Sequence, residues 1–195
     1  MKLFDDLIEN FEKLPGIGHR TAERLAYAIL DKDQEYVTNF SNTLLKSKEK
    51  IHPCPNCGLY TDEDLCEVCK DNNRVQNSII VVSSTRDALA IENVIHDYKY
   101  FVLNGNISLL KNITPDKLNI DILLNRIEQE NIQEVILATD STLDGETTAQ
   151  YLSNLLSSKN LNVYRIGYGL PYGSEIDYLD KFTIERAIKN KNKLN

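Results

Sequence analysis

Residues 79–82 read IIVV, and this short apolar run opens the part of the chain that decides the fold. Isoleucine and valine favour extended backbone, and an unbroken apolar run of this length is typical of a strand buried on both faces. A helical pattern over residues 86–97 follows, and then a second apolar run over residues 100–103. A strand, a helix and a strand in this order predict parallel strands with helices packed on the faces of the sheet.

The alternation continues toward the C-terminus. The remaining expected elements are a helix over residues 115–130, a strand over 134–138, a helix over 146–158, a strand over 162–166 and a final helix over 183–190. Pro115 fits the first turn of the helix expected over residues 115–130, because the N–H that proline lacks would have no partner there. We therefore expect an α/β domain over residues 78–172 and a C-terminal segment over residues 173–195.

The first 53 residues have a different pattern, with apolar side chains recurring every three or four positions. This spacing predicts three helices, over residues 3–13, 19–30 and 33–50. The sequence LPGIG at residues 14–18 separates the first two helices, because proline and glycine break a helical pattern. Residues 1–53 are therefore expected to form a helical region ahead of the α/β part.

All four cysteines of the chain lie within residues 54–69. They form two C-x-x-C pairs separated by eight residues: Cys54 with Cys57, and Cys66 with Cys69. Four thiolates suit the tetrahedral preference of Zn²⁺, and a site made only of cysteines leaves no open position for catalysis. The pattern predicts one structural zinc ion per chain, held in a small element over residues 54–69.

Two disulfides or a redox-active C-x-x-C are the other uses of such pairs. The N-terminus carries acidic residues where a secretory signal would carry basic ones. No apolar run approaches the ~20 residues of a membrane span. We therefore expect a cytoplasmic protein, in which thiols stay reduced, and the doubled pair disfavours a redox motif.

The turn over residues 14–18 is followed by basic residues in the second expected helix. Its two glycines allow backbone N–H groups to approach a phosphate at a helix N-terminus, where the helix dipole favours an anion. The two arginines are four residues apart and share one helix face. This pattern predicts DNA binding through phosphates, without sequence readout. The alternative is an ordinary helical hairpin with two solvated arginines. The candidate DNA contacts are Gly16, Gly18, His19, Arg20, Thr21 and Arg24.

The formal net charge is −7, and most of the acidic excess lies after residue 53. This balance does not exclude DNA binding, because a local basic patch acts within a Debye length of ~8–10 Å. It does predict that a nucleic-acid contact is confined to one place, most naturally the helical region.

An acidic loop follows the expected strand 134–138, and it contains Asp140, Asp144 and Glu146. Ligands of parallel sheets bind at the carboxyl ends of the strands. Acids gathered there could hold Mg²⁺ for phosphoryl transfer. The alternative is a loop whose acids stabilise the N-terminus of the next helix.

Together these features resemble the RecR family of bacterial recombination mediators over essentially the whole chain. The local matches are LPGIG, CPNCG with the second C-x-x-C, TRDALAIE, NGNIS, EVILAT, DGET and GLPYGSEIDYLD. The resemblance implies a helix–hairpin–helix region, a C4 zinc finger and a Toprim-like parallel sheet. It also implies a non-enzymatic DNA clamp, built as a homo-tetrameric ring. Such a clamp works with RecO, and in some species RecF, to load recombinase onto single-stranded DNA.

Catalytic Toprim proteins carry a glutamate after the first strand and a D-x-D after a later one. In this chain Ser83 follows the first strand, Asp140 matches the first aspartate, and Thr142 stands at the second. The incomplete acid set disfavours the alternative function, a small metal-dependent Toprim nuclease. We expect no catalytic residue. We expect instead that the loop of Asp140, Asp144 and Glu146 docks a basic partner, and RecO is the partner that the resemblance implies.

Overall fold

The computed structural model describes residues 1–159, 161–167 and 169–191. They form two compact units, Met1–Ile51 and His52–Asn195. None of the helices in these ranges has the length and hydropathy needed to cross a membrane.

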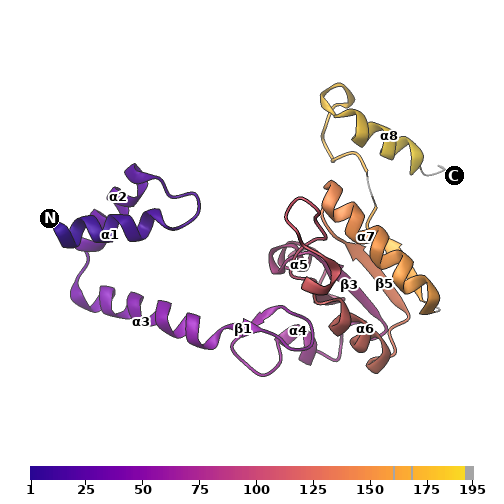
Figure 1. Ribbon diagram of the computed structural model, residues 1–195, viewed down its shortest axis with the longest axis horizontal. Helices are drawn as coiled ribbons and strands as arrows, with labels where there is room; N and C mark the ends of the chain where they lie inside the picture. The colour runs from indigo at the N-terminus through magenta and orange to yellow at the C-terminus, as the bar shows by residue number, and fades with distance from the viewer. Residues whose placement is uncertain (160, 168, 192–195) are drawn as a thin grey trace. The chain divides into compact units, whose positions relative to one another are not determined.

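The N-terminal unit contains three helices, as the apolar spacing predicts: α1 (Lys2–Glu12), α2 (His19–Leu30) and α3 (Gln34–Lys50) (Figure 1). Its small core lies between α1 and α2, where Ile8, Ala22 and Ala26 are buried. The two alanines let the helices approach closely, since neither side chain extends beyond Cβ. The side chain of Asp33 accepts a hydrogen bond from the backbone N–H of Tyr36 at 2.7 Å and caps α3.

The second unit begins with the cysteine element. It contains a two-stranded antiparallel sheet of β1 (His52–Pro53) and β2 (Tyr60–Thr61), followed by the short helix α4 (Glu67–Lys70). Gly58 has a φ of 79°, and a Cβ at this position would lie 3.0 Å from the Cβ of Val102. Glycine is required here by both the turn and the close approach to the neighbouring strand.

The rest of the unit is built on a four-stranded sheet that is parallel throughout, and this confirms the expected α/β class. Its strands are β3 (Ser78–Val82), β4 (Lys99–Val102), β5 (Glu134–Ala138) and β6 (Asn162–Arg165), in the spatial order β4-β3-β5-β6. The helices between them are α5 (Thr85–Glu92), α6 (Ile120–Gln129) and α7 (Leu143–Leu156). A 3₁₀ turn, η2 (Ser157–Lys159), extends α7.

Alternate residues of the central strand β3 bury against different layers. Ile79 and Val81 pack in one core with residues of α6 and α7. Ile80 and Val82 pack in a second core with α5 and with the cysteines, of which three are buried and Cys69 is partly buried. The cysteine element is therefore part of the packing of the sheet and not an appendage on its surface.

Two expected helices end or break where contacts with strand β4 compete with helical propensity. The helix expected over 86–97 ends at Glu92, and the hydroxyl of Tyr100 in β4 donates to the backbone oxygen of Ile95 at 3.1 Å. The helix expected over 115–130 divides into the 3₁₀ turn η1 (Pro115–Lys117) and α6. Asn119 lies between them, and its backbone and side chain both donate to backbone oxygens at the end of β4.

Two other helices begin earlier than expected because a side chain caps them. The helix expected over 146–158 starts at Leu143, where the hydroxyl of Thr142 accepts from the backbone N–H of Gly145 at 3.2 Å. The last helix, α8 (Lys181–Lys189), follows a 3₁₀ turn, η3 (Ile176–Tyr178), and is capped by Asp180. The final four residues of the expected segment 173–195 lie outside the described residues.

Candidate functional site

The sulfur atoms of Cys54, Cys57, Cys66 and Cys69 all lie within 4.8 Å of one another. The Sγ atoms of Cys57 and Cys66 are 3.4 Å apart, and those of Cys54 and Cys69 are 4.0 Å apart. Four sulfurs around zinc at ~2.3 Å stand about 3.8 Å apart in a tetrahedron. The arrangement therefore fits one zinc ion without rearrangement of the backbone.

Backbone turns hold the sulfurs in these positions. The N–H of Gly58 donates to the oxygen of Cys54 at 2.8 Å, and the N–H of Cys69 donates to the oxygen of Cys66 at 3.0 Å. The N–H of Leu59 donates to the sulfur of Cys57 at 3.4 Å. Backbone donors of this kind favour the thiolate form, which is the form that binds a metal.

The thiols are too close together to ionise independently. A hydrogen bond with Cys66, followed by one with Cys69 and by burial, raises the pKa of the Cys57 thiol. The hydrogen bond with Cys57 lowers the pKa of the Cys66 thiol to about 2. A zinc ion bound by all four sulfurs removes this competition for protons, because its double positive charge allows every sulfur to be a thiolate. The donor set and its geometry are those of a structural zinc centre.

The hairpin of the N-terminal unit leaves an open approach at the start of α2. Gly16 has a φ of 81°, and Gly18 is the N-cap of α2 with no side-chain cap. A Cβ at either position would meet no atom within 4 Å. The N–H groups of Thr21 and Ala22 bond to the oxygen of Gly18, so the end of the helix is well formed.

Two arginines project from the exposed side of α2. Arg20 and Arg24 are exposed, and neither forms an ion pair with another residue in the part of the chain that the structure describes. Each arginine precedes a buried alanine, Ala22 or Ala26, by two residues. At 100° per residue, this spacing places the arginine roughly 200° around the helix from the buried side chain. The packing of α2 on α1 therefore turns both guanidinium groups toward solvent.

His19 links the two helices of the hairpin. Its Nδ1 lies 2.7 Å from the Oε1 of Glu12 at the end of α1. The imidazole remains largely exposed, at 71%. The contact fixes the turn, and it also places a carboxylate beside the candidate DNA contacts, which the sequence did not suggest.

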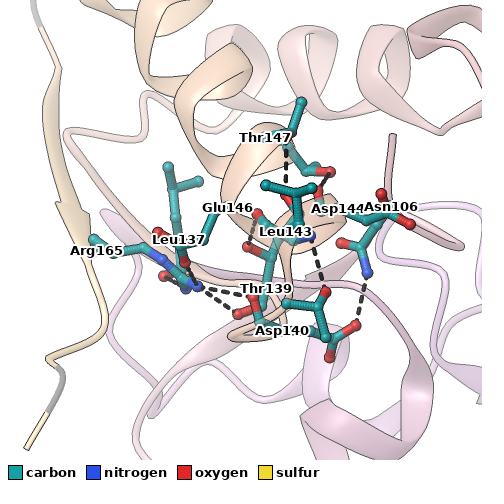
Figure 2. A network of polar contacts seen from close by, with 12 residues as sticks. Asn106, Leu137, Thr139, Asp140, Leu143, Asp144, Glu146, Thr147 and Arg165 are labelled. Carbon is teal, nitrogen blue, oxygen red and sulfur yellow. Dashed lines mark hydrogen bonds and ion pairs between the residues drawn. The ribbon is translucent and has the colours of Figure 1, made fainter. Parts of the chain in front are cut away.

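A hydrogen-bonded chain occupies the carboxyl ends of β3 and β5, where the strand order reverses. Asn106 Nδ2 donates to Asp140 Oδ2 at 2.7 Å, as Figure 2 shows. The Oδ1 of the same side chain accepts from Ser83 Oγ at 2.8 Å. A neutral amide thus bridges the two strand ends at which catalytic Toprim proteins carry acids. Asn106 lies in the family motif NGNIS, but the sequence alone indicates no role for its side chain.

The remaining acids of the loop lie in the first turn of α7, as the capping alternative predicted. Glu146 is engaged inside the chain: its Oε1 accepts from Arg165 Nη2 at 2.9 Å (Figure 2), and its Oε2 accepts from Arg186 Nη2 at 3.0 Å. Arg165 also donates to the backbone oxygens of Leu137 and Thr139. Neither arginine was predicted as a partner of Glu146, since they follow it by 19 and 40 residues in the sequence.

Four family models cover most of the chain. They describe a RecR helix-hairpin-helix over residues 4–47, a RecR zinc finger domain with four cysteines over 51–71, a Toprim domain over 77–167 and a RecR C-terminal region over 169–192. The zinc finger match and the four clustered sulfurs agree, and the chain carries one structural zinc ion.

Several curated relatives match over nearly their full length. The chain is 42% identical to the recombination protein RecR of Natranaerobius thermophilus over 195 residues, which is 99% of this chain and 98% of the relative. It is 40% identical to RecR of Latilactobacillus sakei and 42% identical to RecR of Streptococcus suis. Both of these alignments span 190 residues and 96% of each chain.

Proposed function

Because the chain belongs to the RecR family of recombination proteins, we propose that it is a non-enzymatic DNA-binding mediator of recombinational repair. It acts in the cytoplasm, where its zinc thiolates stay reduced. We assign DNA binding to residues 1–53, the zinc finger to residues 54–69 and partner binding to the Toprim domain over residues 78–172.

The observation that carries the proposal is the exposed basic face of α2. Arg20 and Arg24 stand beside an uncapped helix N-terminus whose two flanking glycines leave room for a phosphate. Backbone N–H groups and the helix dipole then act on one phosphate, and the two guanidinium groups bind this phosphate or its neighbours along the strand. Such contacts position a nucleic acid but do not read its sequence.

Large exposed apolar side chains support assembly into an oligomer. Helix α3 has no buried residue, and its Phe40, Leu44 and Leu45 are 42%, 57% and 69% exposed. In the C-terminal segment, Tyr178 and Phe182 are 82% and 75% exposed. Exposed apolar groups of this kind are typical of protein interfaces. We propose that copies of the chain meet through both regions and form a tetrameric ring.

A ring also reconciles DNA binding with a net charge of −7. Each subunit contributes one small basic face, and several weak phosphate contacts add through their high effective concentration. Oligomerisation is therefore required for tight DNA binding.

The acidic loop is the proposed docking surface for RecO. Asp140 is exposed and Asp144 is half-buried at the start of α7, whereas Glu146 is occupied by two arginines. We therefore assign docking to Asp140 and Asp144, and a structural role to Glu146. The double change Asp140→Lys and Asp144→Lys should abolish capture of RecO, while the same change at the exposed Asp62 and Asp64 should not.

The alternative of a metal-dependent nuclease is disfavoured by the residues at the strand ends. The positions that hold acids in catalytic Toprim proteins are Ser83 and Thr142, and both hydroxyls are engaged in hydrogen bonds. Purified protein with Mg²⁺ or Mn²⁺ should leave DNA uncut. Cleavage that disappears in an Asp140→Ala variant would establish the nuclease instead.

Reconstitution tests the proposed function. On single-stranded DNA coated with single-strand-binding protein, this protein and RecO together should accelerate filament formation by recombinase. Arg20→Ala/Arg24→Ala should lose the acceleration. Lys46→Ala/Lys50→Ala should retain it, because this control removes two cations at the same spacing from α3. Equal acceleration by both variants would refute the assignment of the hairpin.

RecF is the second proposed partner. Whether it contributes is tested by adding it to the same reaction on DNA with a junction between single and double strands. An increase in filament formation beyond that given by RecO would support a role for RecF, and no change would exclude it for this chain.

A further inference from the structure

The four zinc ligands differ in their exposure. Cys54, Cys57 and Cys66 are only 2%, 0% and 5% exposed, whereas Cys69 is half-buried. A reagent or oxidant that attacks the centre from solvent therefore reaches Cys69 most easily. The groups that surround this sulfur therefore bear on how easily the centre is attacked.

A single side-chain amide faces that sulfur. The Nδ2 of Asn56 lies 3.7 Å from the Sγ of Cys69, and it donates to the Oε1 of Glu130 at 2.8 Å. The two hydrogens of the amide allow both contacts at once. Asn56 sits between the first two cysteines, so the zinc turn itself fixes the position of its backbone.

Glu130 follows α6 and is held by two cations from the Toprim domain. The Nε of Arg126 donates to its Oε1 at 3.0 Å, and the Nζ of Lys99 lies 3.6 Å from its Oε2. The guanidinium of Arg126 is 2% exposed and also donates to the oxygens of Tyr100, at 2.8 Å, and Asn56, at 3.3 Å. The zinc turn, β4 and α6 therefore meet on one buried network.

The charges of this network suit a zinc centre. A zinc ion with four thiolates carries a formal double negative charge, and burying that charge is costly unless cations and N–H donors lie nearby. Arg126 and Lys99 supply the cations. Asn56 supplies an N–H to the half-buried ligand Cys69, as the backbone of Leu59 does for Cys57. A donated hydrogen bond withdraws electron density from a thiolate and makes it a poorer nucleophile.

We propose that Asn56, Glu130 and Arg126 form the outer shell of the zinc centre, and that this shell protects Cys69 and sets the rate of zinc release. Asn56 acts directly on the sulfur. Glu130 and Arg126 are positioning residues that orient the amide. Outer-shell partners of metal ligands commonly contribute 10–100-fold to metal affinity. This proposal does not depend on DNA binding by the hairpin, so a negative result for one proposal leaves the other standing.

The test measures zinc release from the full-length, zinc-loaded protein. Excess N-ethylmaleimide is added, and a chromogenic chelator reports the freed zinc. Asn56→Ala should release zinc about 10–100-fold faster than wild type. Asn56→Asp, which keeps the size but loses the donor, should release it at least as fast. Alanine fits the backbone at this position, because Asn56 is not among the non-glycine residues with positive φ in the described part of the chain.

Two controls separate protection of the sulfur from general stability. Glu128→Gln removes a carboxylate from the same helix, where it pairs with Lys159, and should leave the release rate unchanged. Thermal unfolding and the thiolate-to-metal absorption of the Co²⁺-substituted protein are recorded for each variant. We expect a shifted absorption band in Asn56→Ala at a nearly unchanged melting temperature. Zinc release by Asn56→Ala at the rate of Glu128→Gln would overturn the proposal, as would a release rate that only follows a fall in melting temperature.

Discussion

A Cβ atom on Gly145 would lie 2.1 Å from the backbone oxygen of Asp140. The first turn of α7 therefore rests directly on the loop that leaves β5, with no room for a side chain. Because this contact is between backbone atoms, a larger residue cannot be accommodated by a change of rotamer.

Gly145→Ala should therefore lower the free energy of unfolding by ~1–3 kcal/mol, the usual cost of overpacking. The gain in helix propensity of up to ~1 kcal/mol does not offset a backbone clash. Urea denaturation measures the change. Gly167→Ala is the control, since a Cβ at that position meets no atom within 4 Å. Equal stability of the two variants would contradict the close contact between Gly145 and the backbone of Asp140.

The ion pair of Glu146 with Arg186 ties α8 to the Toprim domain. Glu146→Gln should weaken this tether, because a neutral amide holds a guanidinium less strongly than a carboxylate does. We expect faster hydrogen exchange at the backbone amides of Lys181–Lys189. Glu185→Gln removes an exposed pair within α8 and serves as the control. Exchange that is as slow in Glu146→Gln as in that control would show that other contacts hold the helix.

The stability of the fold should fall at low pH, because the carboxylate of Glu92 becomes protonated. Its bidentate hydrogen bonds with Arg74 lower the pKa of this carboxyl below its usual value. A carboxyl whose pKa is lower in the folded than in the unfolded state stabilises the fold above the unfolded pKa of ~4.3, and this stabilisation is lost as the pH falls through the folded pKa.

Glu92→Gln should therefore be less stable than wild type at pH 7, and the difference should shrink as the pH falls below ~4. Urea midpoints measured between pH 7 and pH 3 follow this convergence. The exposed Glu35→Gln is the control. A difference between Glu92→Gln and wild type that stays constant across this range would exclude a role for the charge.

Much of the fold follows from local patterns. The strand over residues 134–138 has the predicted bounds, because the apolar run over residues 135–138 is flanked by polar residues on both sides. The zinc centre was also predictable, since C-x-x-C spacing alone brings two sulfurs onto one ion. Gly58 has a positive φ, a conformation that a glycine directly after the second cysteine can adopt without strain.

Other features depend on contacts between distant parts of the chain. Asn119 breaks a predicted helix because it bonds to the end of β4, 16 and 17 residues earlier. Glu146 resembles a docking residue in the sequence, but Arg165 and Arg186 occupy it in the fold. Asn106 bridges Ser83 and Asp140 only because the parallel sheet brings two strand ends together. A pattern confined to one helix or strand carries no information about such partners.

The zinc ion should stabilise the whole second unit and not only its own turn. Cys54, Cys57 and Cys66 pack in the same core as Ile80 and Val82 of the central strand. Metal analysis should find about one zinc per chain in wild type and none in Cys57→Ala, and this variant should unfold at a markedly lower temperature. His52→Ala, beside the element, should keep its zinc. A metal-free Cys57→Ala protein that is as stable as wild type would show that zinc does not stabilise the second unit.

DNA binding through the hairpin is tested most directly by the salt dependence of affinity. Each phosphate contact contributes ~0.7–0.9 to the slope of log affinity against log salt concentration. Arg20→Ala/Arg24→Ala should bind more weakly and reduce the slope by up to ~0.7–0.9 for each phosphate that is no longer bound. Lys46→Ala/Lys50→Ala should keep the wild-type slope. If instead the arginine variant keeps both the affinity and the slope of wild type, the hairpin does not contact DNA.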